Sequence, residues 1–128
     1  MSKQWQIEFY REPDGTEPVR EFLQDPSLRP GELKQLQVRL QLLADRGLAL
    51  MIQRADILDK IVTEDNLYEL RIDNTPNNPR FFLCALFGKR LILLHAFKKK
   101  SKKTPRRDIQ LAAKRRDLII AMEKDKGK

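Results

Sequence analysis

The sequence predicts an α+β protein, in which helices pack against an antiparallel sheet. Over Glu32–Arg46, leucines recur at three- and four-residue spacing, which is typical of an amphipathic helix that packs on a core. Apolar and polar residues alternate over Leu67–Ile72, as they do in a half-buried strand. Two apolar segments, Arg80–Phe87 and Arg90–Phe97, flank Gly88-Lys89, and this arrangement indicates a β-hairpin.

The remaining elements of the first half are predicted from local patterns. Trp5–Tyr10 alternates and indicates a first strand. A short helix is expected to begin near Glu17-Pro18, because proline is tolerated in the first turn of a helix. Gly47 is placed to end the leucine-rich helix in a left-handed conformation. The mixed segment that follows contains one weaker strand candidate, Leu58–Val62.

The chain is expected to close with a helix. Thr104-Pro105 predicts its start, and the charged residues 123–128 are expected to fray. The predicted order is therefore a strand, an α-hairpin, three or four strands and a helix. With 128 residues and no long linker, we expect a single domain over residues 1–128.

Charge is distributed unevenly along the chain. The formal net charge is +8, yet residues 1–64 hold nine Lys/Arg against eleven Asp/Glu. Residues 65–128 hold seventeen Lys/Arg against seven Asp/Glu. This asymmetry favours a polyanionic partner that binds the second half, although a basic surface that serves only solubility is the alternative.

Two residue counts exclude several kinds of site. Cys84 is the only cysteine and lies in an apolar run, so we expect a buried core thiol and no intramolecular disulfide. His95 is the only histidine, which excludes the usual multi-histidine metal sites. No metal or other cofactor is expected. No apolar run approaches membrane-spanning length, and we expect a cytoplasmic protein.

The densest basic segment of the chain follows the last predicted strand. Seven of the ten residues from Lys98 to Arg107 are basic and none is acidic. Such a run is repulsive within itself, so phosphate binding is one interpretation and a solvated loop is the other. The candidate RNA-binding residues of this segment are Lys100, Lys102, Lys103, Arg106 and Arg107.

A candidate catalytic cluster follows from the predicted topology. Arg71 ends one strand and Arg80 begins the next, so an antiparallel sheet brings them to the same end, where Lys98 and Lys99 leave the third strand. Fixed cations stabilise the charge that develops when a ribose 2′-OH attacks the adjacent phosphate. His95 is the natural titrating candidate for a general base, although its apolar sequence neighbours favour a core or strand-edge histidine.

Two other groups are candidates for proton transfer. A lysine whose pKa is lowered by its basic neighbours is one alternative to His95. Glu69 lies two residues before Arg71 and points to the same side of the strand, either to take part in the chemistry or to pair with a cation.

Four segments of the second half carry a recognisable combination of motifs. They are Leu67-Tyr68-Glu69-Leu70-Arg71, Arg80-Phe81-Phe82, Leu93-Leu94-His95-Ala96-Phe97-Lys98-Lys99-Lys100 and Lys103-Thr104-Pro105. Together they resemble the phage-derived HigB-like branch of the RelE/ParE toxin superfamily, and the resemblance extends over most of the chain, from Trp5 to about residue 119.

The resemblance implies the compact RelE-like fold and the toxin of a type II toxin–antitoxin pair. It implies a metal-independent endoribonuclease that cleaves mRNA on the ribosome, inhibits translation and is neutralised by an antitoxin with a helix-turn-helix domain. By matching motif, Arg71, Arg80 and Lys98 or Lys99 fall where catalytic residues are expected. The chain departs from many RelE-like enzymes because no tyrosine or histidine follows His95.

Two other classes of function are compatible with the same residues. One is a ParE-like inhibitor that binds a protein such as DNA gyrase and cleaves nothing, since a shared fold does not determine function. The other is a non-catalytic RNA-binding module, whose binding would be sensitive to salt and tolerant of sequence.

Overall fold

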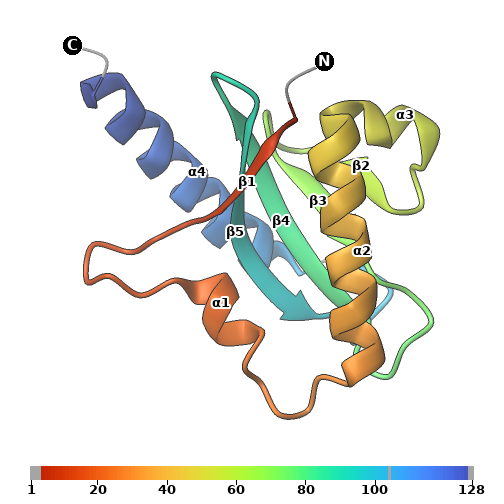
Figure 1. Ribbon diagram of the computed structural model, residues 1–128. Helices are drawn as coiled ribbons and strands as arrows, with labels where there is room; N and C mark the ends of the chain where they lie inside the picture. Colours follow the sequence, from red (N-terminus) through yellow and green to blue (C-terminus); the bar gives the residue numbers. More distant parts are fainter. Residues whose placement is uncertain (1–3, 104, 127–128) are drawn as a thin grey trace.

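A computed structural model describes residues 4–103 and 105–126 of the chain. Figure 1 labels the elements in chain order. They are β1 (Gln6–Phe9), α1 (Pro18–Phe22), α2 (Pro30–Arg46), the 3-10 turn η1 (Gly47–Ala49), α3 (Leu50–Gln53), β2 (Leu58–Lys60), β3 (Tyr68–Arg71), β4 (Pro79–Leu86), β5 (Arg90–Lys98) and α4 (Arg106–Lys126). The predicted α+β class is confirmed.

The five strands form one sheet in the order β1-β5-β4-β3-β2. Strands β2, β3, β4 and β5 pair with one another in antiparallel fashion, so the antiparallel sheet predicted after the α-hairpin is confirmed. Strand β1 joins this sheet in parallel with β5, and the whole sheet is therefore mixed. Side-chain alternation identifies a strand and its two faces, but it carries no information on the direction of the neighbouring strand.

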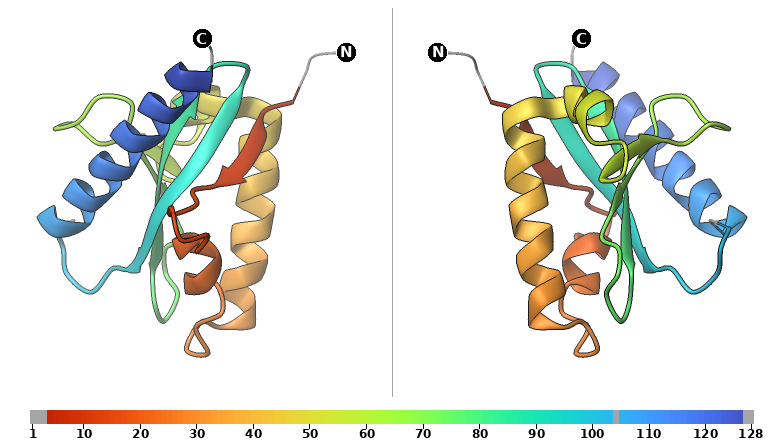
Figure 2. Two further views of the ribbon diagram at one scale, coloured as in Figure 1. Left: turned by 90° about the vertical axis from the view of Figure 1, so that its left-hand side faces the viewer. Right: turned by 90° about the vertical axis from the view of Figure 1, so that its right-hand side faces the viewer.

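Helices cover both faces of the sheet, with α1 and α2 on one side and α4 on the other (Figures 1 and 2). The leucine stripe of α2 packs on the sheet, as predicted, and Cys84 is a buried core thiol. The core under α1 and α2 includes Val19, Leu36, Leu43, Leu70, Phe81 and Leu93. The core under α4 includes Tyr10, Leu67, Phe82, Cys84, Leu94 and Ala112.

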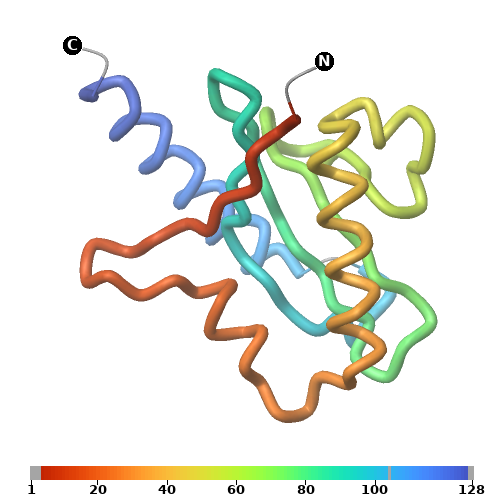
Figure 3. Tube along the Cα trace, in the orientation of Figure 1, coloured from red at the N-terminus to blue at the C-terminus, as the bar shows by residue number. Residues whose placement is uncertain are grey.

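The two ends of the sheet are distinct surfaces. The β4–β5 hairpin and the C-terminal end of α4 lie at one end, and the β3–β4 loop lies at the other (Figure 3). At the hairpin, Gly88 and Lys89 both have positive φ, at +79° and +58°, so the predicted turn is confirmed. Lys98 pairs with Pro79, so β5 delivers the chain to the β3–β4 loop end.

The last helix differs from its prediction at both ends. It begins at Arg106, and Pro105 precedes it and accepts hydrogen bonds from the backbone N–H groups of Asp108 and Ile109. Thr104 lies outside the described residues. Residues 123–126, which we expected to fray, are helical. Within 4–103 and 105–126, none of the helices combines the length and apolar composition that a membrane crossing requires.

Candidate functional site

Two rows of side chains cross the sheet on the face that α4 partly covers. Residues that pair directly across antiparallel strands point to the same face, so the register defines these rows. The first row is Arg71, Arg80 and Phe97, and the second is Asp59, Glu69, Phe82 and His95. The predicted proximity of Arg71 and Arg80 is confirmed, because the two residues are register partners.

Arg71 holds a guanidinium that is fixed on one edge and accessible on the other. Its Nε donates to Glu69 Oε1 at 2.8 Å, and its Nη2 lies 3.4 Å from Asp59 Oδ2. Its side chain keeps 30% of its surface exposed. Burial alone would lower the pKa of Arg71, but the hydrogen bond and charge of Glu69 raise it on balance. Arg71 therefore presents a permanent cation to solvent.

Arg80 is the buried partner in the same row, with only 6% of its side chain exposed. Its Nη2 donates to Asp73 Oδ1 at 2.6 Å, and its Nη1 donates to the carbonyl oxygens of Ile72 and Pro79 at 3.1 and 3.3 Å. These bonds close the β3–β4 loop. Arg80 therefore has a structural task that the sequence pattern does not reveal.

The two adjacent lysines at the end of β5 diverge. Lys98 Nζ lies 2.8 Å from Asp25 Oδ2 and also contacts Ser27 Oγ, in the segment between α1 and α2. The backbone N–H of Lys99 donates to Asn78 O at 3.2 Å, so strand pairing continues one residue past β5. Alternation then places Lys99 on the side of Phe97 and Arg80.

The expected convergence of Lys98 with the two arginines is therefore wrong at the level of its side chain. Topology brings the backbone of Lys98 to the correct end, but strand alternation turns its side chain to the opposite face. The hydrogen bond from Lys98, supported by bonds from Ser27, lowers the pKa of Asp25 to about 2. This pair connects β5 to the segment before α2.

His95 connects the sheet to α4. Its Nε2 lies 2.5 Å from Asp108 Oδ1, and Arg115 Nη1 lies 3.4 Å from its Nδ1. Burial lowers the pKa of His95, against the opposing effect of the Asp108 carboxylate. Since both ring nitrogens have protein partners, this geometry does not present His95 as a base to an external hydroxyl. The rings of Phe82 and Phe97 pack beside it, with centroids 6.3 and 5.9 Å away.

The basic segment Lys98–Arg107 runs from the end of β5 to the first turn of α4. It lies at the same end of the sheet as the β3–β4 loop (Figure 2). The predicted RNA-binding residues of this segment are all exposed, and they are Lys100, Lys102, Lys103, Arg106 and Arg107. Exposed cations of this kind are suited to a polyanion.

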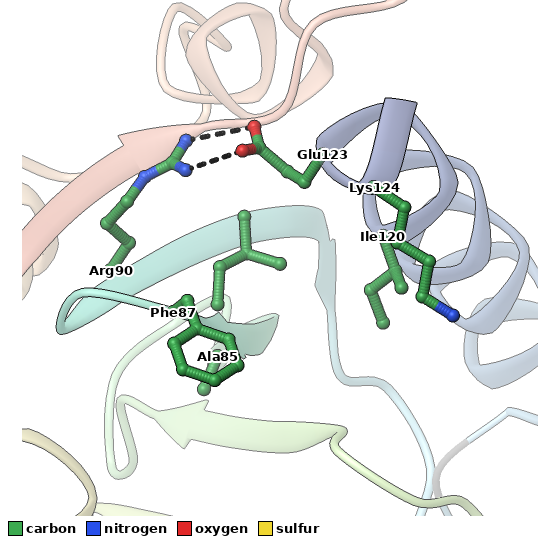
Figure 4. Close-up of a pocket in the computed structure, with 7 residues that line it drawn as sticks. Ala85, Phe87, Arg90, Ile120, Glu123 and Lys124 are labelled. Atoms are coloured by element: carbon green, nitrogen blue, oxygen red, sulfur yellow. Dashed lines mark hydrogen bonds and ion pairs between the residues drawn. The ribbon is translucent and has the colours of Figure 1, made fainter. Parts of the chain in front are cut away.

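A different surface lies at the opposite end of the sheet, between the β4–β5 hairpin and α4. It is a pocket of about 480 Å³, with Ala85, Leu86 and Ile120 on its wall and the fully exposed Phe87 at its edge (Figure 4). Arg90 borders it and bonds to Glu8 and Glu123, which ties β5 to β1 and α4. This pocket is mainly apolar and shares no residue with the two rows.

No cluster of metal-binding side chains occurs in the part of the chain that the structure describes. Burial raises the pKa of the Cys84 thiol to about 12, so this cysteine stays a neutral thiol in the core.

Comparison with models of known protein families shows the family of the chain. The family described as "Phage derived protein Gp49-like (DUF891)" matches residues 21–117. The chain belongs to this family. The Gp49-like family is part of the RelE/HigB-like toxin group, and the five-stranded sheet with its C-terminal helix is consistent with the RelE-like fold. No curated protein matches the chain.

The family match spans both rows of the site in this Gp49-like protein, whereas β1 lies outside it. Sequence reasoning found both arginines and the glutamate of these rows. It missed Asp59 and Asp73, which pair with the two arginines, and Asp108, which pairs with His95. These carboxylates come close to their partners only through the strand register, the β3–β4 loop and the packing of α4. The Glu-Leu-Arg spacing was the one local signal, since residues two apart on a strand share a face.

Proposed function

We propose that this Gp49-like protein is the toxin of a type II toxin–antitoxin pair and a ribosome-dependent mRNA endonuclease of the phage-derived HigB-like branch. The observation that carries the proposal is the partly exposed guanidinium of Arg71, which is the register partner of the buried Arg80, at the end of the sheet where the exposed basic segment leaves β5. Membership of the RelE/HigB-like toxin group supports the toxin assignment.

The proposed reaction is transesterification of RNA. The 2′-oxygen of a ribose bonds to the adjacent phosphorus, its proton passes to a base, and the bond from phosphorus to the 5′-oxygen of the next nucleotide breaks. The leaving oxygen takes up a proton, so the products are a 2′,3′-cyclic phosphate and a 5′-hydroxyl. Negative charge grows on the phosphoryl oxygens in the transition state, and guanidinium groups stabilise it without a metal or other cofactor.

The geometry divides the predicted site residues into groups. Arg71 and Lys99 are proposed to contact the reacting phosphate, with Arg80 holding the β3–β4 loop and adding positive charge from behind. The exposed residues Lys100, Lys102, Lys103, Arg106 and Arg107 are proposed to hold flanking RNA or ribosomal backbone. His95 is assigned to anchoring α4, and Lys98 to the contact with Asp25.

The proposal also includes two macromolecular partners. Toxins of this group are paired with an antitoxin, so a cognate helix-turn-helix antitoxin is the expected inhibitor. We expect the protein to act on the ribosome. The ribosome is a large polyanion that presents the mRNA strand, and binding of the cationic residues to it would supply much of the binding free energy.

Induced expression with transcript mapping tests the proposal. Wild-type protein should stop growth and produce new 5′ ends within translated regions, as mapped by primer extension. Arg71→Ala should slow cleavage by about 100-fold, the typical effect of removing one donor to a developing oxyanion. The matched control is Arg54→Ala, because the exposed Arg54 side chain pairs, among the described residues, with its neighbour Asp56 alone, at 2.8 Å. It should remain as active as wild type.

Two results would contradict the endonuclease, and a third would contradict the assigned site. Growth arrest with intact transcripts and a DNA damage response would instead favour the gyrase-inhibitor class. RNA binding without toxicity would favour a non-catalytic module. Cleavage that is equally fast in Arg71→Ala and wild type would show that the active site does not lie at Arg71.

A further inference from the structure

The two carboxylates that flank Arg71 differ in their exposure, in their distance from its guanidinium and in their place in the sheet. Glu69 is 2% exposed and lies 2.8 Å from Nε, whereas Asp59 is 45% exposed and lies 3.4 Å from Nη2. Glu69 sits on β3 inside the sheet, while Asp59 sits on β2 at its edge. The contact of Arg71 with Glu69 is therefore short and buried, and its contact with Asp59 is long and exposed to solvent.

We propose that Glu69 is a positioning residue that holds Arg71 in the orientation for binding, and that Asp59 is an exchangeable counter-ion that a phosphate of RNA replaces. This inference rests on the proposed function, because it assigns the ligand of Arg71 as a phosphodiester. It adds two carboxylates with opposite effects to a site otherwise described by its cations.

The burial of Glu69 explains why it stays in place. Its Oε2 has no hydrogen-bond partner among the described residues, so Arg71 supplies the neutralising contact through Oε1. A buried carboxylate that loses its paired cation is strongly unfavourable, and Arg71 is therefore held at its Nε. Holding Nε leaves Nη1 and Nη2 as the pair of donors that a guanidinium offers to a phosphate.

The exposure of Asp59 explains why it leaves. Its other oxygen, Oδ1, accepts from the backbone N–H of Lys60 at 2.8 Å, so the residue keeps a local bond after it releases Arg71. An exposed ion pair at this separation contributes little, whereas a charge-assisted bond from a guanidinium to phosphate is among the stronger contacts. The remaining contact of Nη1, to Ala55 O, is also 3.4 Å long.

Arg80 offers no comparable exchange. Its carboxylate partner Asp73 lies at 2.6 Å, and its Nη1 is occupied by backbone carbonyls. Only 6% of its side chain is exposed, against 30% for Arg71. The register thus pairs a fixed arginine with an available one, and the exposed one is the phosphate ligand.

The test measures binding of a fluorescein-labelled, 2′-O-methyl single-stranded RNA by anisotropy at fixed salt, since this probe binds but cannot be cleaved. Asp59→Asn should tighten binding by about threefold and Glu69→Gln should weaken it by about tenfold. Asp56→Asn, an exposed loss of the same charge, measures the general electrostatic gain. The gain from Asp59→Asn must exceed it. Loss of a negative charge favours RNA generally, so weakening by Glu69→Gln requires a specific cause.

A background without Arg71 separates positioning from structure. In Arg71→Ala, Asp59→Asn should keep only the general electrostatic gain that Asp56→Asn measures, and Glu69→Gln should no longer weaken binding. Equal weakening by Glu69→Gln with and without Arg71 would overturn the positioning role. If Glu69→Gln does not fold by thermal unfolding, the loss in Arg71→Ala of the excess gain of Asp59→Asn over Asp56→Asn decides the inference alone.

Cleavage on programmed ribosomes distinguishes this inference from the proposed function. Opposite shifts in probe binding with no cleavage by wild type would retain the phosphate exchange and reject the endonuclease. Cleavage by wild type with no specific effect of either carboxylate on probe binding would reject the exchange and retain the endonuclease. Absence of probe binding by wild type would overturn the inference.

Discussion

His95 on β5 and Asp108 in the first turn of α4 lie 2.5 Å apart, measured from Nε2 to Oδ1. This contact joins the helix that follows the basic segment to the sheet face that carries Arg71 and Arg80. Arg115, about two turns further along α4, contacts both the His95 ring and the carbonyl oxygen of Leu94. The start of α4 is thus connected to β5 at several points, and the basic segment is anchored at both of its ends.

The burial of His95 predicts a pH dependence of stability. Burial lowers the pKa of His95 below its ordinary 6.5, so the unfolded chain takes up this proton more readily than the folded chain does. The free energy of unfolding should be constant through the titration range above 6.5 and should fall as the pH drops just below it. Denaturant unfolding between pH 8 and pH 5.5, on the order of half-unit steps, measures this slope.

His95→Gln is the control for that slope. His95 is the only histidine, so the substitution should flatten the pH dependence in this window while leaving lower-pH transitions of the carboxylates unchanged. A slope that persists in His95→Gln would assign it to another group.

Gly47 and Trp5 predict a site that does not tolerate a side chain. Gly47 ends α2 with φ at +59°, and a Cβ placed on it would lie 2.2 Å from the Trp5 indole. Gly47→Ala should therefore lower the free energy of unfolding by about 2 kcal/mol or more, through strain and overlap. Thermal unfolding followed by Trp5 fluorescence measures this.

Gly31→Ala is the matched control, because Gly31 lies in the first turn of α2 with open space around its Cβ position. Alanine there should be neutral or stabilising by up to about 1 kcal/mol. Equal losses at both glycines would show that the Trp5 contact is unimportant.

The parts of the fold that could be predicted are those that follow from local sequence pattern and strand order. The β4–β5 hairpin, the leucine-rich α2 and the proximity of Arg71 and Arg80 follow from periodicity and strand order, which a sequence carries directly. The parallel placement of β1 does not, because it depends on tertiary packing alone. Strand order predicts the end of the sheet at which Lys98 lies, but the face to which its side chain points depends on strand alternation, which turns it towards Asp25.

Glu32 predicts a second, more acidic transition. This buried carboxylate accepts bonds from the backbone N–H of Arg29 at 2.8 Å and from the backbone and side chain of Asn77. Burial alone would raise its pKa, but these bonds lower it to about 2. Its contribution to stability is therefore complete above 4.5 and is lost as the pH falls through about 2.

Glu32→Gln should lower the free energy of unfolding by roughly 2 kcal/mol at neutral pH, because charge-assisted bonds to a loop and a helix start are weakened together. Urea unfolding measures the loss. Glu21→Gln, on the exposed side of α1, should change stability little. If both substitutions have the same effect, the bond between α2 and the β3–β4 loop does not stabilise the fold.

Lys98 and Lys99 predict different results for adjacent substitutions. Lys98 bonds to Asp25 and Ser27 on the face of α1 and α2, so Lys98→Ala should lower the melting temperature while retaining most RNA cleavage in the folded protein. Asp25→Asn should also lower the melting temperature and should add little to Lys98→Ala, since the two residues share one interaction.

Lys99 lies on the arginine side of the sheet, so Lys99→Ala should keep the melting temperature and lower RNA affinity by about tenfold. Melting curves and anisotropy on the same preparations separate these effects. The opposite pattern, with Lys98→Ala inactive at an unchanged melting temperature, would return Lys98 to the catalytic residues that sequence reasoning predicted.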